Sequence, residues 1–346
     1  MKILFAGSPA IAVDSIGALS AMECSGEDIQ LAAILTNPDS PRGRKGDPVP
    51  SDLSAAAAAV SAERIAKGFP PIIQIKSEKA DSRVREEIAA LKCDLLICFA
   101  FGCIFGPKFL SLFPRGGINI HPSLLPKYRG PAPIPAAILN NETETGITIQ
   151  TIAAEMDAGL ILAREKIPLD GSETTESLGI TVAKKAAQIL PAFIREFIKG
   201  NVKGVPQEGD PVFSSMITKE NGRIDWNLNA VDIDARVRAY YPWPLCYTSW
   251  HGEDIFILEG CVFDDMLPSH LVRDPLNPSI PLFTYQYEGF SRHLTGSILG
   301  MNECGILIQT GDGVYAVKKL QRQSKKAMDW KSFLNGARGF IGSRLE

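Results

Sequence analysis

Residues 116–138 read GGINIHPSLLPKYRGPAPIPAAI, and this stretch decides how the rest of the chain is organised. Asn119 and His121 stand two positions apart, so in a strand their side chains leave the same face. A proline-rich turn follows, and the prolines from residue 131 onward are compatible with the first turn of a helix. This order of strand, polar pair, loop and helix is typical of a ligand crevice in an open α/β sheet. In an alternative interpretation, the two side chains only cap the strand end by binding backbone groups.

The length and composition of the chain indicate a soluble globular protein. Its 346 residues are enough for two domains. A hydrophobic content of 45% and a charged content of 22% are ordinary for this class. The net charge of −3 excludes a global basic field, so any nucleic-acid binding must depend on local patches.

The cysteines and the apolar segments exclude several classes of protein. The seven cysteines are odd in number and form no C-x-x-C motif, so neither a disulfide framework nor a metal site is indicated. The start, MKILFAGSP, is too short for a signal peptide and is typical of a first strand. The longest apolar run, residues 95–105, is too short to span a bilayer. We therefore expect a cytoplasmic protein with no membrane partner and no metal.

Strands and helices alternate before residue 200. The expected strands cover residues 2–6, 30–36, 72–75, 94–101, 146–152 and 160–169, and the expected helices cover 11–21, 52–67, 81–92 and 173–199, the last interrupted by Pro191. This alternation predicts an α/β fold with a doubly wound, mostly parallel sheet. The turn after the first strand lacks the three-glycine fingerprint, so a dinucleotide site is not indicated.

The chain changes character after residue 199. Residues 200–215 are rich in turn formers and predict a linker. Short alternating runs beyond it predict a small β barrel over residues 216–346. The tail from residue 316 carries eight basic residues against two acidic ones, with a helix expected over 327–340. Such clustering favours contact with a phosphate backbone, although a solvated surface is the alternative.

Residues 37–52 form a long loop with four prolines, two glycines and the cations Arg42, Arg44 and Lys45, which Asp39 and Asp47 oppose before Asp52 closes the stretch. A loop of this length in a compact domain is usually functional or disordered. A solvated flexible loop is the alternative interpretation.

The run INIHPSLLPKYRGPAP, followed by ETGITIQTIAAEMDAGLIL, resembles the formyltransferases that use 10-formyltetrahydrofolate. The resemblance is carried by an Asn-x-His pair, an S-L-L-P loop at residues 123–126 and a D-x-G turn at 157–159. It extends over nearly the whole chain and is strongest to the members that act on initiator tRNA. FAGSP, TNPDSPRGRKGDPVP, RIDWN and YPWP are further matching segments.

This resemblance implies transfer of a formyl group from 10-formyltetrahydrofolate to the α-amino group of methionine on initiator tRNA. Because no exposed apolar face is obvious in the sequence, we expect a monomer. It implies a formyltransferase catalytic domain of Rossmann-like fold over residues 1–199, a linker over 200–215, and an OB-like, tRNA-binding barrel over 216–346. The segment 265–294 is longer than the family leads us to expect, and no role is assigned to it.

The chemistry of acyl transfer agrees with the three residues that we expect to be catalytic. Attack of an amine on the formyl group gives a tetrahedral intermediate with an oxyanion, to which Asn119 can donate a hydrogen bond. His121, with a pKa near physiological pH, can donate to the oxyanion or shuttle the proton of the amine. Asp157 can orient His121 and favour its imidazolium form. Taken alone, Asp157 is also a common turn residue.

The resemblance also suggests the binding residues. Folate is expected at Phe99, Phe101, Gly102, Ile104, Ser123, Leu124, Leu125 and Pro126. The tRNA is expected at Arg42, Arg44, Lys45, Lys318, Arg322, Lys325 and Lys326.

Two other functions stay open. One is formyl transfer to a nucleotide-linked amino sugar, or hydrolysis of formyl-folate, neither of which needs the basic loop and tail. The other is a nucleic-acid-binding module without activity, against which the intact Asn119, His121 and Asp157 argue.

We expect Arg44→Ala to raise the KM for tRNA more than it weakens folate binding, because it removes a phosphate contact. Steady-state kinetics against each substrate in turn measure the two effects. Equal effects on both substrates would contradict a role of this loop in tRNA binding.

Overall fold

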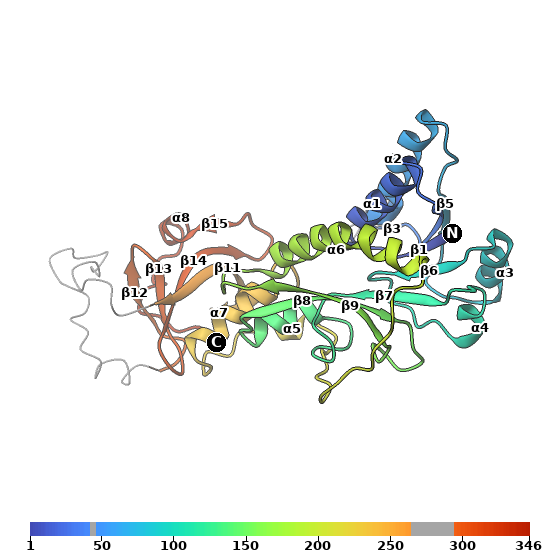
Figure 1. Ribbon diagram of the computed structural model, residues 1–346. Coiled ribbons are helices and arrows are strands. Elements are labelled where there is room, and N and C mark those ends of the chain that lie inside the picture. Colours follow the sequence, from blue (N-terminus) through green and yellow to red (C-terminus); the bar gives the residue numbers. More distant parts are fainter. Residues whose placement is uncertain (42–45, 264–293) are drawn as a thin grey trace. The chain divides into compact units, whose positions relative to one another are not determined.

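The computed structural model describes residues 1–41, 46–263 and 294–346, which form two compact units. Unit 1 comprises residues 1–134, 143–169 and 177–216, and unit 2 comprises 135–142, 170–176 and 217–346 (Figure 1). Three residues predicted to bind tRNA (Arg42, Arg44 and Lys45) lie outside the described residues, as does nearly all of the predicted insertion.

Unit 1 is built on a seven-stranded sheet with the order β5-β2-β1-β6-β7-β8-β9. Its strands are β1 (Lys2–Ala6), β2 (Gln30–Thr36), β5 (Ile73–Lys76), β6 (Leu95–Cys98), β7 (Gly117–His121), β8 (Glu144–Thr151) and β9 (Ile161–Pro168). The first five strands of this order are parallel, whereas β7, β8 and β9 pair antiparallel. The predicted mostly parallel α/β sheet is confirmed.

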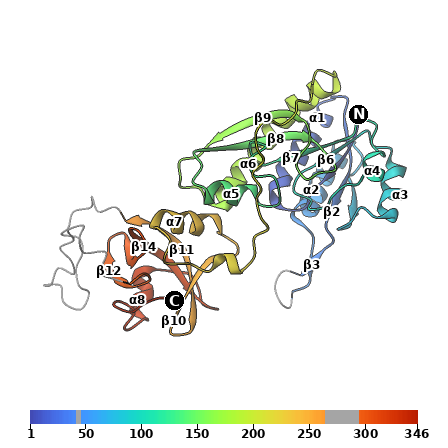
Figure 2. The ribbon, with the colours of Figure 1, turned by 90° about the horizontal axis from the view of Figure 1, so that it is seen from below.

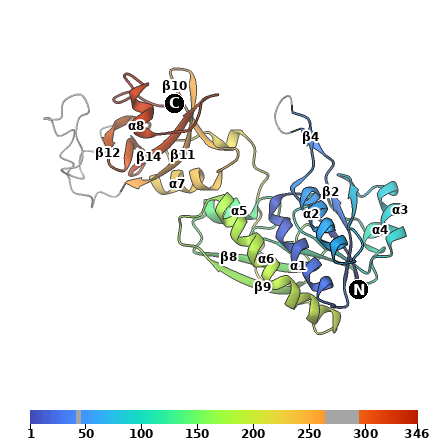
Figure 3. The same ribbon diagram turned by 90° about the horizontal axis from the view of Figure 1, so that it is seen from above.

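Helices cover both faces of the sheet. They are α1 (Val13–Cys24), α2 (Asp52–Ala66), α3 (Ser82–Leu91), α4 (Pro107–Leu110) and α6 (Thr175–Ile198), whereas α5 (Pro133–Leu139) belongs mostly to unit 2. From β1 the chain steps outward through β2 to β5, and then returns to β6 and β7 on the other side of β1. Because such crossovers are right-handed, α1 and α2 cover one face while α3 and α4 cover the other. Figures 1 and 3 show α6 beside α1, where Arg195 donates to Glu27 at 2.8 Å.

This topology places a crevice at the carboxyl ends of the parallel strands. The chain leaves β1 in one direction and β6 in the other, and ligands of open α/β sheets bind at such a switch point. The predicted strand 94–101 is shorter than expected, because the backbone turns through left-handed conformations at Ala100 (φ 54°) and Gly102 (φ 79°). The turn directs the following loop toward the crevice instead of continuing the sheet.

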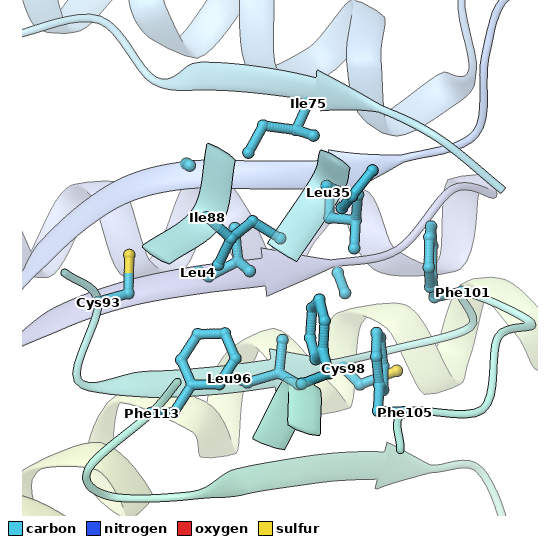
Figure 4. Close-up of a cluster of buried hydrophobic side chains, with 14 of the residues drawn as sticks. Leu4, Leu35, Ile75, Ile88, Cys93, Leu96, Cys98, Phe101, Phe105 and Phe113 are labelled. Carbon is cyan, nitrogen blue, oxygen red and sulfur yellow. The ribbon is translucent and has the colours of Figure 1, made fainter. Parts of the chain in front are cut away.

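A hydrophobic core supports this end of the sheet. Ile88 of α3 and the phenylalanines of residues 101–113 pack against Leu4, Leu35 and Leu96 of the central strands (Figure 4). The rings of Phe101, Phe105, Phe109 and Phe113 follow one another, with successive centroids 5.8, 4.8 and 5.6 Å apart; the first two pairs are stacked and the last is tilted. Core packing therefore holds the loop after β6 in place.

Helix α6 corrects one prediction. Pro191 was expected to interrupt it, but the helix continues to Ile198. Buried side chains recur every four residues along one face (Leu178, Val182, Ala186, Leu190 and Ile194), so packing compensates for the hydrogen bond that proline cannot donate.

Residues 37–52 hold more structure than a plain loop. The short strands β3 (Ser40–Pro41) and β4 (Pro48–Val49) pair antiparallel and project from unit 1 (Figure 2). Ser51 then caps α2 by accepting from the backbone N of Ser54 at 3.1 Å.

Unit 2 is the β-rich part of the chain, as predicted. Its antiparallel strands are β10 (Cys246–Trp250), β11 (Glu253–Phe263), β12 (Ile298–Asn302), β13 (Gly305–Gln309), β14 (Val314–Arg322) and β15 (Met328–Asp329), with helices α7 (Ala230–Ala239) and α8 (Trp330–Asn335). The predicted helix 327–340 is wrong at both ends. Asp329 belongs to β15 and caps α8, and the helix ends before Gly336. No helix in the described part of the chain is both long and apolar enough for a membrane crossing.

A buried ion pair joins the ends of α1 and α2. Arg64 donates to both carboxylate oxygens of Glu23, at 2.5 and 3.0 Å, and the two residues are 1% and 6% exposed. Glu23 also accepts from the backbone N of Leu31, and Arg64 donates to the carbonyl of Pro70. The pair therefore ties two helices to the start of β2 and to the loop after α2.

We expect Glu23→Gln to lower the free energy of unfolding by about 3–5 kcal/mol, because Arg64 would remain buried without its counter-charge. Urea unfolding measures the change. The control is Glu144→Gln, which removes an exposed partner of Lys166 (2.9 Å) and should cost less than about 1 kcal/mol. Similar values for the two variants would contradict this view of the pair.

Candidate active site

The end of β7 carries the polar pair that the sequence singles out. Asn119 is half-buried and His121 is only 4% exposed. On one side Asn119 pairs with Cys98 of β6, and on the other with Gln150 of β8. The pair therefore lies in the interior of the sheet, on the strand next to β6 and one strand away from the switch point between β1 and β6.

Asp157 is the residue on which the site converges. Its Oδ1 accepts from Asn119 Nδ2 at 3.2 Å and from Gln150 Nε2 at 2.9 Å. Its Oδ2 accepts from the backbone N of Gly130 at 2.9 Å and lies 3.5 Å from His121 Nδ1. The structure thus brings the three predicted catalytic residues together. Gln150 was missed, although a glutamine that alternates with isoleucines just before the D-x-G turn is a signal that could have identified it.

The hydrogen bonds of His121 determine which of its ring nitrogens is available. Nε2 lies 2.9 Å from the carbonyl oxygen of Tyr128. Because a carbonyl only accepts, Nε2 carries the proton, and Nδ1 faces Asp157. Burial lowers the pKa of His121, and the opposing effects of the Asp157 charge and the Tyr128 carbonyl are smaller. The charge of Asp157 favours the imidazolium form, but burial outweighs this effect, so the resting ring is neutral.

Gln207 supports the site from the segment predicted to be a linker. Its Nε2 donates to the carbonyl oxygens of Asp157 (2.7 Å) and Gly159 (2.9 Å), and its Oε1 accepts from Arg129 Nη2 at 2.8 Å. Nearby, the backbone N of Arg129 donates to Val212. A single glutamine among turn formers carries no sequence signal, so this support was missed.

Two glycines permit the close approaches that this geometry requires. A Cβ at Gly159 would lie 1.7 Å from the carbonyl oxygen of Thr151 in β8. Gly130 has a φ of 114°, and a Cβ there would lie 2.6 Å from the carbonyl oxygen of Ser214. The D-x-G turn therefore sits directly on β8, with Asp157 aimed at the strand ends.

A cavity of about 560 Å³ opens in front of this cluster. The loop after β6, the turn at 153–157 and the ends of β1 and β7 form its walls. Ile104, Met156 and Met216 line it while exposing 69, 49 and 71% of their surface. Such exposure of large apolar side chains around one opening is typical of a ligand-binding rim.

Only some of the predicted folate residues reach this cavity. Phe101, Gly102 and Ile104 line it, whereas Phe99 is fully buried in the core. None of residues 123–126 lines it. Ser123 is buried and donates to the carbonyl of Lys127, and Leu124, Leu125 and Pro126 line a different cavity together with Arg164.

The described residues predicted to bind tRNA all lie in unit 2. Lys318 and Arg322 are on β14, and Lys325 and Lys326 are exposed just beyond it. The Arg322 guanidinium lies over the rings of Trp250 (5.7 Å) and Phe333 (5.3 Å). Arg322 therefore has a packing role of its own, whereas the two lysines are open to solvent.

Cys98 lines the cavity but is not suited to covalent catalysis. Burial raises the pKa of Cys98 to about 12, so this thiol stays protonated and is a poor nucleophile. Across the described ranges, no group of three or more His, Cys, Asp or Glu side chains is placed to hold a metal ion.

Comparison with solved structures identifies the fold. HypX from Aquifex aeolicus, solved in complex with tetrahydrofolic acid, matches 99% of this chain and 48% of its own at a TM-score of 0.61 and 14% identity. An N-formyltransferase from Helicobacter canadensis, solved with folinic acid and dTDP-3-aminofucose, matches 92% of this chain and 99% of its own at 0.60 and 18% identity. Identities this low show a shared fold only.

Sequence comparison is more specific. The family model for formyl transferase matches residues 1–194, and that for the formyl transferase C-terminal domain matches residues 216–338. The chain is 42% identical to the methionyl-tRNA formyltransferase of Treponema denticola, with 100% of both chains covered. It is 33% identical to that of Borreliella burgdorferi, with 99% and 98% covered. These matches span the cavity and the Asn119, His121 and Asp157 cluster, and the chain belongs to the formyl transferase family.

Proposed function

We propose that this protein transfers the formyl group of 10-formyltetrahydrofolate to the α-amino group of methionyl initiator tRNA, giving N-formylmethionyl-tRNA for translation initiation. One observation carries the proposal. Asn119, His121 and Asp157 meet at one cavity in a chain that is 42% identical, over its full length, to a methionyl-tRNA formyltransferase.

The cavity suits the folate co-substrate. Its volume of about 560 Å³ falls within the range of sites for drug-sized ligands. Phe101, Ile104 and Ile152 supply apolar walls for the pterin ring. The exposed backbone of the loop after β6 supplies hydrogen-bonding groups for the edge of that ring.

The mechanism follows from the available atoms of the site. The amine attacks the formyl carbon, and His121 Nδ1, which has no proton at rest, takes the proton from the amine. Asp157 Oδ2, 3.5 Å away, stabilises the imidazolium that forms. Asn119 gives one amide N–H to Asp157 and has a second for the oxyanion of the tetrahedral intermediate. The intermediate then expels folate N10, to which a proton returns.

The proposal assigns different tasks to the two parts of the chain. Residues 1–199 are the catalytic domain, and residues 216–346 bind tRNA through cations such as Lys325 and Lys326. The segment 200–215 connects them and contributes Gln207 to the site. The partner is initiator tRNA, and we propose a monomer that acts in the cytoplasm, where translation begins.

We expect Asn119→Ala to lower kcat for formyl transfer to methionyl-tRNA on the order of 10²–10³-fold, because one oxyanion donor is lost. His121→Ala should cost at least as much, since it removes the group that takes the proton from the amine. The control is Asn140→Ala, because Asn140 is exposed and its side chain donates to the carbonyl of Ala136 in α5. Single-turnover assays with charged tRNA measure these rates.

A loss of less than about threefold in both site variants would contradict the assigned roles, since each missing group should slow the chemical step by far more. If the formyl group is transferred to water or to an amino sugar nucleotide and none reaches charged tRNA, the proposed acceptor is wrong.

His121 gives a second prediction, on pH. Because burial lowers its folded-state pKa, the unfolded chain binds more protons as the pH falls below the ordinary value of about 6.5. The free energy of unfolding therefore falls as the pH drops from the unfolded-state pKa of His121 to its folded-state pKa. The stabilising contribution of the neutral ring is fully present above both values. His121→Gln should flatten this slope, whereas His251→Asn, at an exposed turn, should not.

Urea titrations between pH 5 and 8 measure the slopes. An equal slope in wild type and His121→Gln would show that the ring is not held neutral by burial.

A further inference from the structure

Arg129 is a buried cation that takes no part in the proposed mechanism. It lies in the loop between β7 and α5. Its Nη1 donates to Glu155 Oε1 at 3.3 Å, but the Glu155 side chain is 71% exposed, and such exposed pairs contribute little. Its shorter contacts are with Gln207, whose Oε1 accepts from Nε at 3.1 Å and from Nη2 at 2.8 Å. The guanidinium is therefore directed mainly at one side-chain amide.

That contact determines which way the Gln207 amide points. A guanidinium only donates, so it requires the amide oxygen, and the amide nitrogen must face the opposite side. There Nε2 donates to the carbonyl oxygens of Asp157 and Gly159, and it lies 3.3 Å from the Oε1 atom of Gln150. Because Gln150 Oε1 also accepts from the backbone N of Gly159, its own Nε2 is left to donate to Asp157.

The hydrogen bonds between Arg129 and Asp157 consequently have one direction. The guanidinium at the first end only donates, the carboxylate at the other end only accepts, and the amides of Gln207 and Gln150 lie between them. Reversal of either amide would bring two donors or two acceptors into contact. Arg129 thus acts on Oδ1 of the carboxylate through two side chains whose orientation it sets.

The backbone after Arg129 leads to the other carboxylate oxygen. The Arg129 carbonyl accepts from the backbone N of Ser214 at 2.7 Å, and the next peptide N, that of Gly130, donates to Asp157 Oδ2 at 2.9 Å. Residues 129–130 therefore hold Oδ1 through side chains and Oδ2 through the backbone. Two attachments oppose rotation of the carboxylate, so Oδ2 keeps facing Nδ1 of His121 at 3.5 Å.

We infer that Arg129 is a positioning residue for formyl transfer, which orders the amides of Gln207 and Gln150 so that the Asp157 carboxylate keeps its orientation toward His121. This inference rests on the proposed function. Arg129 is not among the described residues that line the cavity. Its loss should therefore slow the chemical step and leave substrate binding unchanged.

The first test replaces Arg129 by methionine and by lysine in the full chain. Arg129→Met should lower kcat for formyl transfer about 10–100-fold, because small displacements of a catalytic group have effects of this size. KM for either substrate should stay within about twofold, as for an interaction that matters only in the transition state. Arg129→Lys keeps a donor for Gln207 Oε1 and should restore kcat to within about fivefold of the wild type.

The control for this test is Glu155→Gln, which removes the exposed partner of the same arginine and should leave kcat and KM unchanged. Equal kcat in the methionine and lysine variants of Arg129 would overturn the inference. A change in KM with kcat intact would also overturn it, because Arg129 would then act in binding.

The second test concerns position 207. In Gln207→Glu the new carboxylate still accepts from Arg129, beside which it stays ionised, but its other oxygen meets the carbonyls of Asp157 and Gly159, where only a donor fits. Gln207→Met loses the donor without adding this repulsion. We expect kcat at least about threefold lower in Gln207→Glu than in Gln207→Met. Equal values would show that Gln207 acts through packing alone, against the inference. This comparison decides the matter if Arg129→Met does not fold.

Hydrogen exchange of the Gln150 side-chain amide, followed by NMR, needs no substrate. Exchange should be at least about tenfold faster in Arg129→Met than in the wild type and stay slow in Arg129→Lys, because the order of the amides is lost only in the first variant. Slow exchange in both would overturn the inference. If the wild type formylates no charged tRNA, the proposed function is wrong, and the exchange rates still show whether Arg129 orders the two amides.

Discussion

The carboxylate of Asp157 is the interaction on which the site depends. It accepts hydrogen bonds from one strand end, from the neighbouring strand and from a loop backbone, and it stands beside the ring of His121. Each of these contacts requires the turn at 157–159 to lie against β8, which only a glycine at position 159 permits. The carboxylate is therefore both the electrostatic partner of the base and the fixed point that positions the groups around it.

Burial determines the protonation state of that base. A histidine beside a carboxylate in water would gain affinity for a proton, but desolvation at the end of a central strand opposes this gain and exceeds it. The ring is consequently neutral at rest and able to accept a proton. The adjacent charge acts mainly on the transient cation, so the arrangement favours the transition state more than the ground state.

Much of this arrangement could be predicted from the sequence, because it depends on local patterns. The alternation of strands and helices predicted the sheet, and the spacing of Asn119 and His121 predicted a shared face. Features that depend on tertiary contacts could not be predicted. Gln207 lies fifty residues from Asp157 in the sequence and donates to its carbonyl oxygen, a contact that no local sequence pattern predicts. Local rules predict that Pro191 interrupts the helix, but the buried side chains on either side of it stabilise α6, which continues to Ile198.

The contacts of Gln207 and Ser214 also bear on how the catalytic unit is completed during synthesis. The last strand of its sheet ends at Pro168 and its last helix at Ile198, but the segment that supports Asp157 comes later. A nascent chain can thus form the entire sheet before the residues that steady its carboxylate have left the ribosome. A catalytic fragment should accordingly be cut after Met216, where unit 1 ends, and not at the end of its last helix.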